Sequence, residues 1–291
     1  MRKFALRLTV FSMMLISSFV ASYFFNTHSQ YRTRLDDKHF NILIVGDSHV
    51  RRGINPKRLT NADNISQPAE PYVISFWKLQ EALKRSSIDT VILGFTHHTL
   101  SSYNEMKFSD PEWSSEMFRR SYFIGDPLEI QERVEVNRIE YAKVYFRNVC
   151  VYPNLKHDTW VGEYKRSKGG DVSDPETVIA RRYYHGGEQT QLSEFNMQFL
   201  DSITALCNRS NIELLLVGCP LSKGYLNQIP DEFKNAYDLR VKELNSNGIR
   251  VIDFTQAGFN DSLFINPDHL NAAGSDKLME ELRAVIYHNT M

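Results

Sequence analysis

The sequence predicts an α/β fold, a three-layer sandwich around a mostly parallel β-sheet, preceded by one transmembrane helix. Short apolar runs such as 42–45 and 90–94 are typical of strands buried on both faces. Segments with apolar residues at helical spacing, such as 72–85 and 192–209, separate these runs. Strands that alternate with helices pair in parallel through right-handed crossovers, and this arrangement gives the sandwich.

The composition is that of a globular protein. The chain has 291 residues, of which 42% are hydrophobic and 24% charged. The formal net charge of −1 does not favour a nucleic acid or another polyanion as partner. The cysteines, Cys150, Cys207 and Cys219, lack the spacing of a zinc site. We expect free buried thiols, with a Cys207–Cys219 disulfide as the alternative.

A membrane segment is predicted near the start of the chain. An uncharged run from Leu8 to Phe25 comes close to the roughly 20 residues that a bilayer span needs. Arg2, Lys3 and Arg7 precede this run, and basic residues before a span favour an orientation with the N-terminus inside. The rest of the chain is therefore expected outside the cytoplasm, in the periplasm or at the cell surface.

Two fates of this segment are open. Val20 and Ser22 form an acceptable cleavage pattern, so the segment can be a signal peptide that is removed. Its length and its aromatic end favour an uncleaved signal anchor over residues 1–28. Residues 29–39 are polar and are expected to form a linker. The remainder, 40–291, is expected to be one α/β domain.

Gly46-Asp-Ser48 directly follows the first predicted strand. Gly46 can take a tight turn because it has no Cβ. The turn places Ser48 at the carboxyl end of a strand, where open α/β sheets keep their ligand sites. A serine there, next to a helix N-terminus, is a candidate nucleophile. The alternative is an ordinary Asp/Ser helix cap.

A candidate base for this serine lies near the other end of the chain. A nucleophilic serine needs a base, usually histidine, and a third group that holds the ring of the histidine. His269 lies on a proline-containing loop before the last predicted helix, with Asn266 and Asp268 just upstream. The parallel layout brings Ser48 and His269 to the same edge of the sheet.

Gly-Asp-Ser48 together with Asp268-His269-Leu-Asn before a final helix resembles the SGNH hydrolases, also called the GDSL-like esterase and acetyltransferase superfamily, of the membrane-anchored bacterial type. The resemblance covers roughly residues 40–285 and rests on the two ends of that range. It implies an SGNH/flavodoxin-like fold and acyl-ester hydrolysis or O-acetyl transfer. Ser48 would attack the acyl carbonyl and His269 would take its proton. Neither a cofactor nor a metal is expected.

The position that orients His269 departs from the family pattern. The family has Asp three residues before the histidine, where this chain has Asn266. An amide can hold the ring, but it does not stabilise the imidazolium, and in the serine protease triad the change from Asp to Asn costs about four orders of magnitude in kcat. The chain therefore uses Asp268 or Asp261 instead, runs a slower reaction, or has lost catalysis.

The resemblance also implies an oxyanion hole. Ser66 stands where the family usually has glycine, and a backbone N–H can serve from either residue. Thr96 stands where the family has an asparagine whose side chain completes the hole. A threonine hydroxyl can donate one hydrogen bond. A plain polar loop around Ser66 is the alternative.

Three residues are candidates for substrate binding. His49 and Arg51 lie beside Ser48 and could bind an anionic group, with solvated surface charge as the alternative. His97 and His98 follow the strand at 90–94, and one of them is expected to face a substrate cleft. We take His97 as the candidate. Neighbouring side chains of an extended backbone point apart, which makes this pair a poor chelate. A metal-dependent hydrolase built on the two histidines is a third, weaker hypothesis.

An insertion at about 100–192 interrupts the α/β rhythm, and we interpret it as a cap or a substrate-facing segment. Residues 127–145 have a helical pattern, and 162–187 form a polar, glycine-bearing run. A loop of that length is usually functional or disordered. Residues 181–185 could contact a polysaccharide or an anionic group, with a surface turn as the alternative.

Together these features predict a membrane-anchored, extracytoplasmic enzyme. It would hydrolyse or transfer an acyl ester, most simply O-acetyl, on a cell-envelope or secreted glycan. The expected partners are a glycan or an acylated small molecule, the membrane through the N-terminal helix, and an envelope complex. The alternative is a catalytically inactive SGNH-like scaffold in a polysaccharide export or modification complex.

Overall fold

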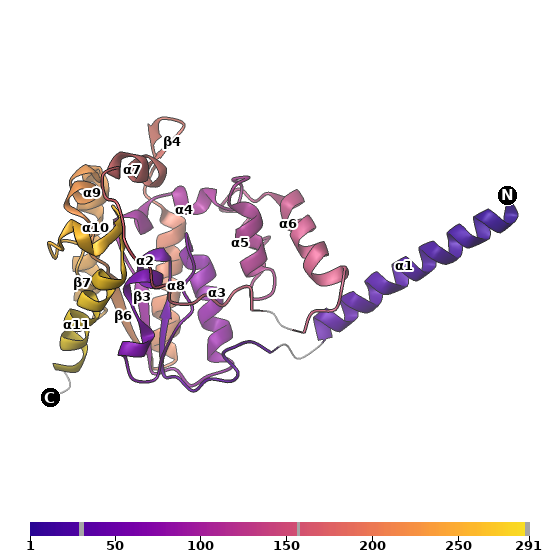
Figure 1. The fold of residues 1–291 in the computed structure, drawn as a ribbon, viewed down its shortest axis with the longest axis horizontal. Coiled ribbons are helices and arrows are strands. Elements are labelled where there is room, and N and C mark those ends of the chain that lie inside the picture. Colours follow the sequence, from indigo (N-terminus) through magenta and orange to yellow (C-terminus); the bar gives the residue numbers. More distant parts are fainter. Residues whose placement is uncertain (29–31, 156–157, 289–291) are drawn as a thin grey trace. The chain divides into compact units, whose positions relative to one another are not determined.

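The structure is a computed structural model that describes residues 1–28, 32–155 and 158–288 (Figure 1). Residues Lys38–Met106 and Val161–Met291 form an α/β unit. Its core is a five-stranded parallel sheet in the order β2-β1-β3-β6-β7. The strands are β1 (Ile42–Val45), β2 (Ala62–Asn64), β3 (Thr90–Gly94), β6 (Glu213–Gly218) and β7 (Arg250–Asp253). The predicted α/β class with a mostly parallel sheet is confirmed.

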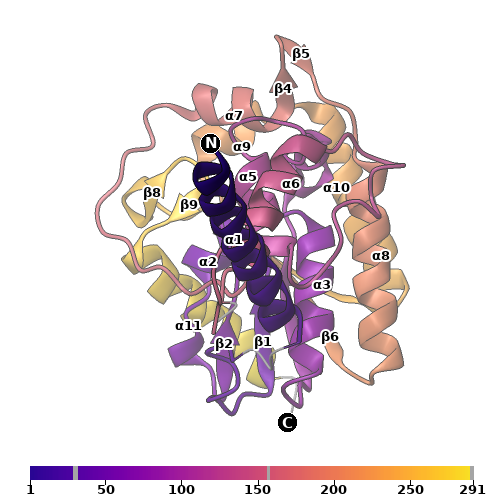
Figure 2. The same ribbon diagram turned by 90° about the vertical axis from the view of Figure 1, so that its right-hand side faces the viewer.

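Helices cover both faces of this sheet (Figure 2). Ile44, Ile92 and Val217 share a core with α2 (Ser48–Gly53) and α11 (Ala272–His288). The alternate strand residues, such as Leu43 and Val91, are equally buried on the face covered by α3 (Tyr72–Leu83) and α8 (Glu194–Arg209). Because both faces are buried, these strands read as continuous apolar runs in the sequence.

Short elements lie in the connections between the strands and helices of this unit. They are η1 (Pro56–Arg58), η2 (His97–Leu100), α4 (Tyr103–Met106), α9 (Lys223–Gln228), η4 (Asp261–Leu263) and the strand pair β8 (Phe264–Asn266) and β9 (His269–Leu270). Helix α10 (Asp231–Ser246) precedes β7. The pair β8–β9 is antiparallel and places Asn266 opposite His269.

The run 162–187 was expected to be one long loop, and this expectation is wrong in part. It contains α7 (Pro175–Tyr183) and the first strand of the hairpin β4 (Tyr184–His185) and β5 (Glu188–Gln189). Asp174 caps α7 by accepting a hydrogen bond from the Thr177 N–H at 3.0 Å, and Pro175 occupies its first turn. These start signals were present in the sequence, but the surrounding polar residues masked them.

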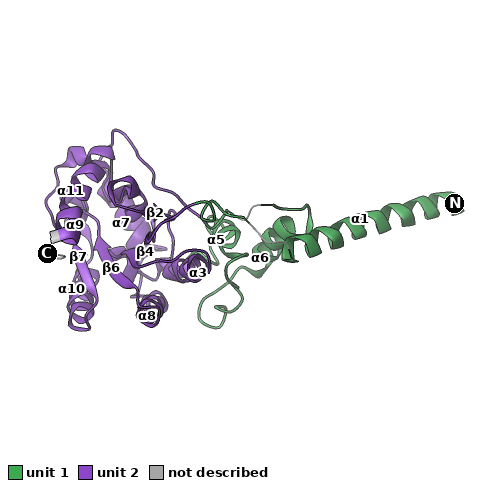
Figure 3. Ribbon diagram, turned by 90° about the horizontal axis from the view of Figure 1, so that it is seen from below, with its two compact units in different colours: residues 1–37, 107–160 green, residues 38–106, 161–291 purple. Residues whose placement is uncertain are grey.

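The remaining residues, Met1–Asp37 and Lys107–Trp160, form a second compact unit (Figure 3). It holds α1 (Arg2–His28), α5 (Ser114–Ser121), α6 (Arg138–Tyr145) and a π-helical turn, η3 (Phe146–Cys150). The helix expected over 127–145 therefore begins only at Arg138. The predicted linker at 29–39 begins with residues 29–31, which lie outside the described part.

Helix α1 is long and apolar enough to cross a membrane, with a mean hydropathy of 1.8 over its best window. A signal sequence passes the same test of length and composition. In the part of the chain that the structure describes, Cys150, Cys207 and Cys219 are all free thiols, so the alternative Cys207–Cys219 disulfide is not formed.

Candidate active site

Ser48 is the first residue of α2 and follows β1 through a tight turn at Gly46. Gly46 has φ 128°, a conformation that L side chains rarely adopt, and a Cβ there would lie 3.2 Å from the Gly94 nitrogen. Asp47 caps α2, because its side chain accepts a hydrogen bond from the His49 N–H at 2.9 Å. The turn and the cap together fix where the Ser48 hydroxyl lies.

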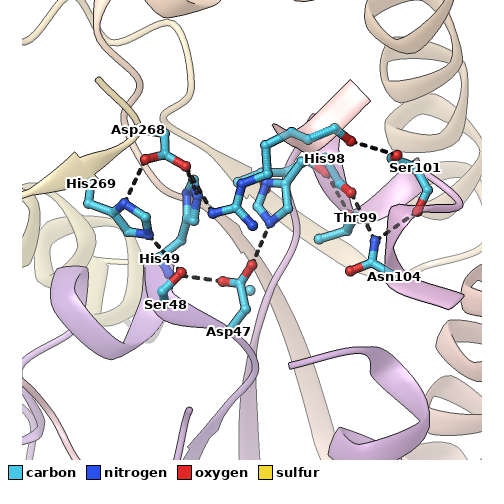
Figure 4. A network of polar contacts seen from close by, with 12 residues as sticks. Asp47, Ser48, His49, His98, Thr99, Ser101, Asn104, Asp268 and His269 are labelled. Carbon is cyan, nitrogen blue, oxygen red and sulfur yellow. Dashed lines mark hydrogen bonds and ion pairs between the residues drawn. The ribbon is translucent and has the colours of Figure 1, made fainter. Parts of the chain in front are cut away.

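His269 contacts Ser48 directly (Figure 4). The distance from His269 Nε2 to Ser48 Oγ is 2.6 Å, although the two residues lie 221 positions apart. Each residue is only 7% exposed. The carboxylate of Asp268 lies on the other side of the ring and can only accept a proton, so the ring proton sits on Nδ1. Nε2 is therefore the nitrogen that accepts from the Ser48 hydroxyl.

Two side chains share the Nδ1 side of His269. Asn266 Oδ1 accepts the hydrogen bond at 3.0 Å, and Asp268 Oδ1 lies 2.6 Å from the same Nδ1, where it can pair with the ring once the ring is protonated. The amide at the family position thus directs the ring, while the neighbouring carboxylate supplies the negative charge. Asp261, the other carboxylate considered, is exposed in η4. The structure brings Ser48, His269, Asn266 and Asp268 into one group.

Arg182 of α7 also reaches Asp268. Its Nη2 lies 3.0 Å from Asp268 Oδ2, and both side chains are buried. Burial alone raises the pKa of Asp268, but His269 and Arg182 outweigh it and hold that pKa well below its usual value. Sequence reasoning missed this contact. The available signal was that Val178, Ile179 and Arg182 share the buried face of one helix.

A second aspartate–histidine pair lies beside the first. His98 Nε2 lies 2.5 Å from Asp47 Oδ2, and the Thr96 hydroxyl lies 2.8 Å from His98 Nδ1. Burial, followed by the charge of Arg182, lowers the pKa of His98 to about 3, so the ring is neutral near pH 7. A neutral ring donates from Nε2 to Asp47 and accepts at Nδ1, which makes Thr96 the donor there.

Asp47 stays ionised in this pair. Burial raises the pKa of Asp47, but the neighbouring His98 and His49 and the hydrogen bond from His98 outweigh burial and hold the pKa below its usual value. The carboxylate therefore serves both as the cap of α2 and as the acceptor for His98.

His49 lies between the two pairs. The centre of its ring is 4.5 Å from that of His98 and 4.7 Å from that of His269. Its Nε2 is 3.5 Å from Asp268 Oδ2, and the side chain is buried. The substrate-binding role predicted for His49 stays a prediction, and in this structure the ring serves as packing between the two histidines.

The other two candidates for substrate binding, His97 and Arg51, make contacts of their own. The ring of His97 stacks on Tyr237 of α10, with the ring centres 4.1 Å apart, so it does not join the group around Ser48. Burial lowers the pKa of His97 to about 3. Arg51 is partly exposed in the last turn of α2, and its carbonyl accepts from the Lys165 N–H at 2.9 Å.

Both predicted oxyanion donors are engaged elsewhere. The Ser66 N–H donates to Asn64 Oδ1 at 3.0 Å, and the chain at Gly162 lies against the Ser66 carbonyl. The Thr96 hydroxyl proton is held by His98. Their oxyanion roles stay predictions that require these bonds to rearrange. The Ser48 N–H is in the first turn of α2, where N–H groups lack intrahelical acceptors, and it is the donor best placed for an oxyanion.

The clustered ligand types raise the question of a metal. Asp47, His49 and His98, and likewise His49, Asp268 and His269, each place three ligand atoms within 4.8 Å of one another. Most of these atoms already make direct contacts, such as Nε2 of His98 with Asp47 at 2.5 Å. A metal here would have to displace hydrogen bonds that hold these aspartate and histidine side chains in their positions. Of the pair His97–His98, only His98 belongs to such a group.

Comparison with known proteins gives structural likeness only. No family model matches the chain, and no curated protein matches it. A candidate acylhydrolase from Bacteroides fragilis is 11% identical with a TM-score of 0.46, covering 91% of this chain and 94% of its own. A GDSL-like lipase from Bacteroides thetaiotaomicron is 9% identical with a TM-score of 0.40, covering 94% and 98%. Likeness at this level concerns the fold alone, so the chemistry rests on the residues themselves.

Proposed function

We propose that this protein is a serine-dependent acyl-ester hydrolase or O-acyltransferase. The observation that carries the proposal is the 2.6 Å contact between Ser48 Oγ and His269 Nε2, with Asn266 and Asp268 behind the ring. A neutral imidazole that accepts from a serine hydroxyl is the arrangement that activates the hydroxyl as a nucleophile.

The reaction proceeds in two halves. Ser48 Oγ attacks the acyl carbonyl as His269 Nε2 takes its proton, and the Ser48 N–H donates to the oxyanion that forms. His269 then gives the proton to the departing alcohol oxygen, which leaves an acyl group on Ser48. Water, or a sugar hydroxyl in a transferase, loses its proton to His269 and attacks the acyl-serine. The bond between the acyl carbon and Ser48 Oγ then breaks, His269 returns its proton to Oγ, and the carboxylic acid or the acylated sugar leaves.

Asp268 takes the part of the family's aspartate, whose position three residues before the histidine is occupied by Asn266 in this chain. The proton transfer makes an imidazolium, and a carboxylate 2.6 Å from Nδ1 stabilises that charge where the Asn266 amide cannot. Arg182 holds Asp268 ionised without contacting His269 in the described contacts. This arrangement favours an active enzyme over an inactive scaffold built on the same fold.

The substrate we propose is an O-acylated glycan of the cell envelope or a secreted glycan. Ser48 is 7% exposed, which favours a small acyl group such as acetyl on a larger carrier. Arg2, Lys3 and Arg7, in the first two turns of α1, favour an anchor whose following domain lies outside the cytoplasm, where such glycans occur. The membrane-anchored, extracytoplasmic location is part of this proposal.

The test is turnover of p-nitrophenyl acetate by the full-length protein in detergent, beside Ser48→Ala and His269→Ala. Loss of turnover in both variants, with unchanged circular dichroism, supports the acyl-serine mechanism. An acetylated polysaccharide, with and without an acceptor sugar, then separates hydrolase from transferase. Equal background turnover of all three proteins on both substrates would contradict the proposal and favour the scaffold.

A further inference from the structure

The end of α1 is tied into its own unit by buried polar contacts. Asn26 donates from Nδ2 to the carbonyls of Val149 and Tyr152, each at 2.8 Å, and its Oδ1 accepts from the Asn154 N–H at 2.6 Å. The side chain is 3% exposed. A buried amide that satisfies three backbone groups belongs to a specific tertiary fold, because removing it would leave those groups without partners.

We propose that α1 remains part of the folded protein and that residues 138–155, called here the interfacial segment, lie in the membrane interface beside it. The segment comprises α6, η3 and the five residues after them. It adds a second membrane contact to the span itself and is independent of the reaction proposed for Ser48.

The depth of the interfacial segment follows from its contact with α1. The ring of Phe146 packs edge-on against Phe19, with the ring centres 5.3 Å apart. Phe19 precedes Phe25, the last residue of the uncharged run, by six positions, or about 9 Å along a helix. A bilayer that surrounds α1 as far as Phe25 therefore reaches the level of Phe146.

The exposed side chains of the interfacial segment fit that position. Large hydrophobic side chains are exposed at Ile139, Phe146, Val151, Tyr152 and Leu155. Ile139 and Leu155 reach 71% and 73% exposure. Among the described residues that follow α1 these are five of the ten exposed large hydrophobic side chains, so the segment concentrates them. Water disfavours such a cluster, whereas the boundary of the acyl chains accommodates it.

The charges on the same segment are mainly basic. Arg138, Lys143 and Arg147 are exposed, and the acidic residue there, Glu140, lies 3.4 Å from Lys143. Basic side chains next to apolar ones extend their charged ends to lipid headgroups and favour anionic lipids. The partner that fits is therefore a bilayer containing anionic lipid.

Removal of α1 as a signal peptide would undo this arrangement. Cleavage after Ser22 would take Phe19 away from Phe146 and would leave Asn26, which binds the carbonyls of Val149 and Tyr152, as the fourth residue of the shortened chain. The apolar surface of the segment would then gain further exposed area. Retention of α1 is therefore part of the same inference.

The test uses tryptophan fluorescence of the full chain in vesicles of phosphatidylcholine and phosphatidylglycerol, with and without brominated acyl chains. Phe146→Trp and Leu155→Trp report on the interfacial segment. Phe11→Trp, within α1, establishes insertion. The matched control is Leu239→Trp on α10, an exposed position with 66% exposure outside the segment.

The chain already has three tryptophans, so the contribution of the added one is taken as the difference between each variant and the wild type. We expect bromine to quench that contribution markedly more at 146 and 155 than at 239. Leu155→Trp keeps the test decisive if Phe146→Trp disturbs the contact with Phe19. Equal, weak quenching at 146, 155 and 239 in protein whose Phe11→Trp signal is quenched would overturn the proposal, and would indicate that another protein covers the segment. The intact mass of protein extracted from membranes should be that of the full 33.8 kDa chain. A mass lacking α1 would contradict retention.

Discussion

Two aspartate–histidine pairs flank His49, and they differ in which ring nitrogen faces the carboxylate. In the pair with Asp268, the carboxylate lies at Nδ1 of His269, which leaves Nε2 to Ser48. In the pair with Asp47, the carboxylate holds Nε2 of His98, and the hydroxyl of Thr96 bonds Nδ1. Similar groups at similar burial thus give one pair that faces the Ser48 hydroxyl and one that holds the turn before α2.

The difference follows from what each aspartate also does. Arg182 binds one carboxylate oxygen of Asp268, Oδ2, and the other oxygen, Oδ1, faces Nδ1 of His269. Asp268 can therefore stabilise a positive charge on His269. Asp47 is committed as the cap of α2 through the His49 N–H, so its carboxylate is part of the turn that presents Ser48. We therefore expect changes at the first pair to act on rate and changes at the second to act mainly on stability.

The largest expected difference in kcat is between variants that lack the Ser48 hydroxyl and variants that lack the Thr96 hydroxyl. Ser48→Ala should lower kcat by about a thousandfold or more, because no other group can form the acyl intermediate. Thr96→Val removes the matching hydroxyl of the second pair and should lower kcat by less than about tenfold, since the Thr96 hydroxyl is bonded to His98 in this structure. Steady-state kinetics on p-nitrophenyl acetate measure both. Similar losses of kcat in the two variants would contradict the different roles assigned to the two aspartate–histidine pairs.

The next effect concerns the charge behind His269. Asp268→Asn should lower kcat by about a hundredfold to ten-thousandfold, because the imidazolium loses its counter-charge. Adding Asn266→Asp to that variant places a carboxylate at the family position and should restore part of the rate. Comparing kcat of the single and double variants measures this. Full activity of folded Asp268→Asn would show that the Asn266 amide suffices.

A smaller effect on rate, but a clear one on stability, is expected at the second pair. His98→Gln leaves the buried Asp47 carboxylate without its strongest partner and should lower the free energy of unfolding by about 3 kcal/mol. Urea denaturation of the full chain in detergent measures this value. His269→Gln is the control and should destabilise less, because Ser48 and Asn266 are neutral partners and Asp268 keeps Arg182. The reverse order of the two losses would contradict the assignment.

The smallest expected effect concerns the dependence of kcat/KM on pH. Burial lowers the pKa of His269 to about 4, although Asp268 raises it, and only the neutral ring acts as base. The ratio kcat/KM should therefore stay flat from neutral pH down to about pH 5 and fall as pH drops through the pKa of His269. Hydrolysis followed from pH 3 to 8 gives the midpoint, with the intrinsic fluorescence recorded to show that the fold persists. A midpoint near 6.5 would indicate an exposed histidine.

The parts of the site that could be predicted are those written in short stretches of sequence. Gly46 to Ser48 and Asn266 to His269 each follow a recognisable local pattern, and the parallel sheet predicted from apolar runs brings their ends together. Even there, the choice between Asn266 and Asp268 was open. The structure shows both beside Nδ1, because β8 and β9 place Asn266 opposite His269 while Asp268 is its neighbour.

The contacts that could not be predicted depend on long-range packing. Arg182 reaches Asp268 from a helix inside a polar insertion, and nothing in its local sequence indicates which carboxylate it meets. Thr96 has a hydroxyl and Ser66 an N–H that could donate to an oxyanion. The sequence does not show that these donors are already bonded to His98 and Asn64. Local propensity fixes the elements, whereas the partner of a buried polar group depends on the packing of the whole unit.

The most direct measurement of the central claim is the site of acylation. Full-length protein is incubated with p-nitrophenyl acetate or a fluorophosphonate probe, quenched in acid, digested and mapped by mass spectrometry, beside His269→Ala. We predict a single label on the peptide that carries Ser48 and a strong loss of that label in the variant. Folded wild-type protein that takes no label at Ser48, or the same label with and without His269, would contradict the assignment of Ser48 as a nucleophile activated by His269.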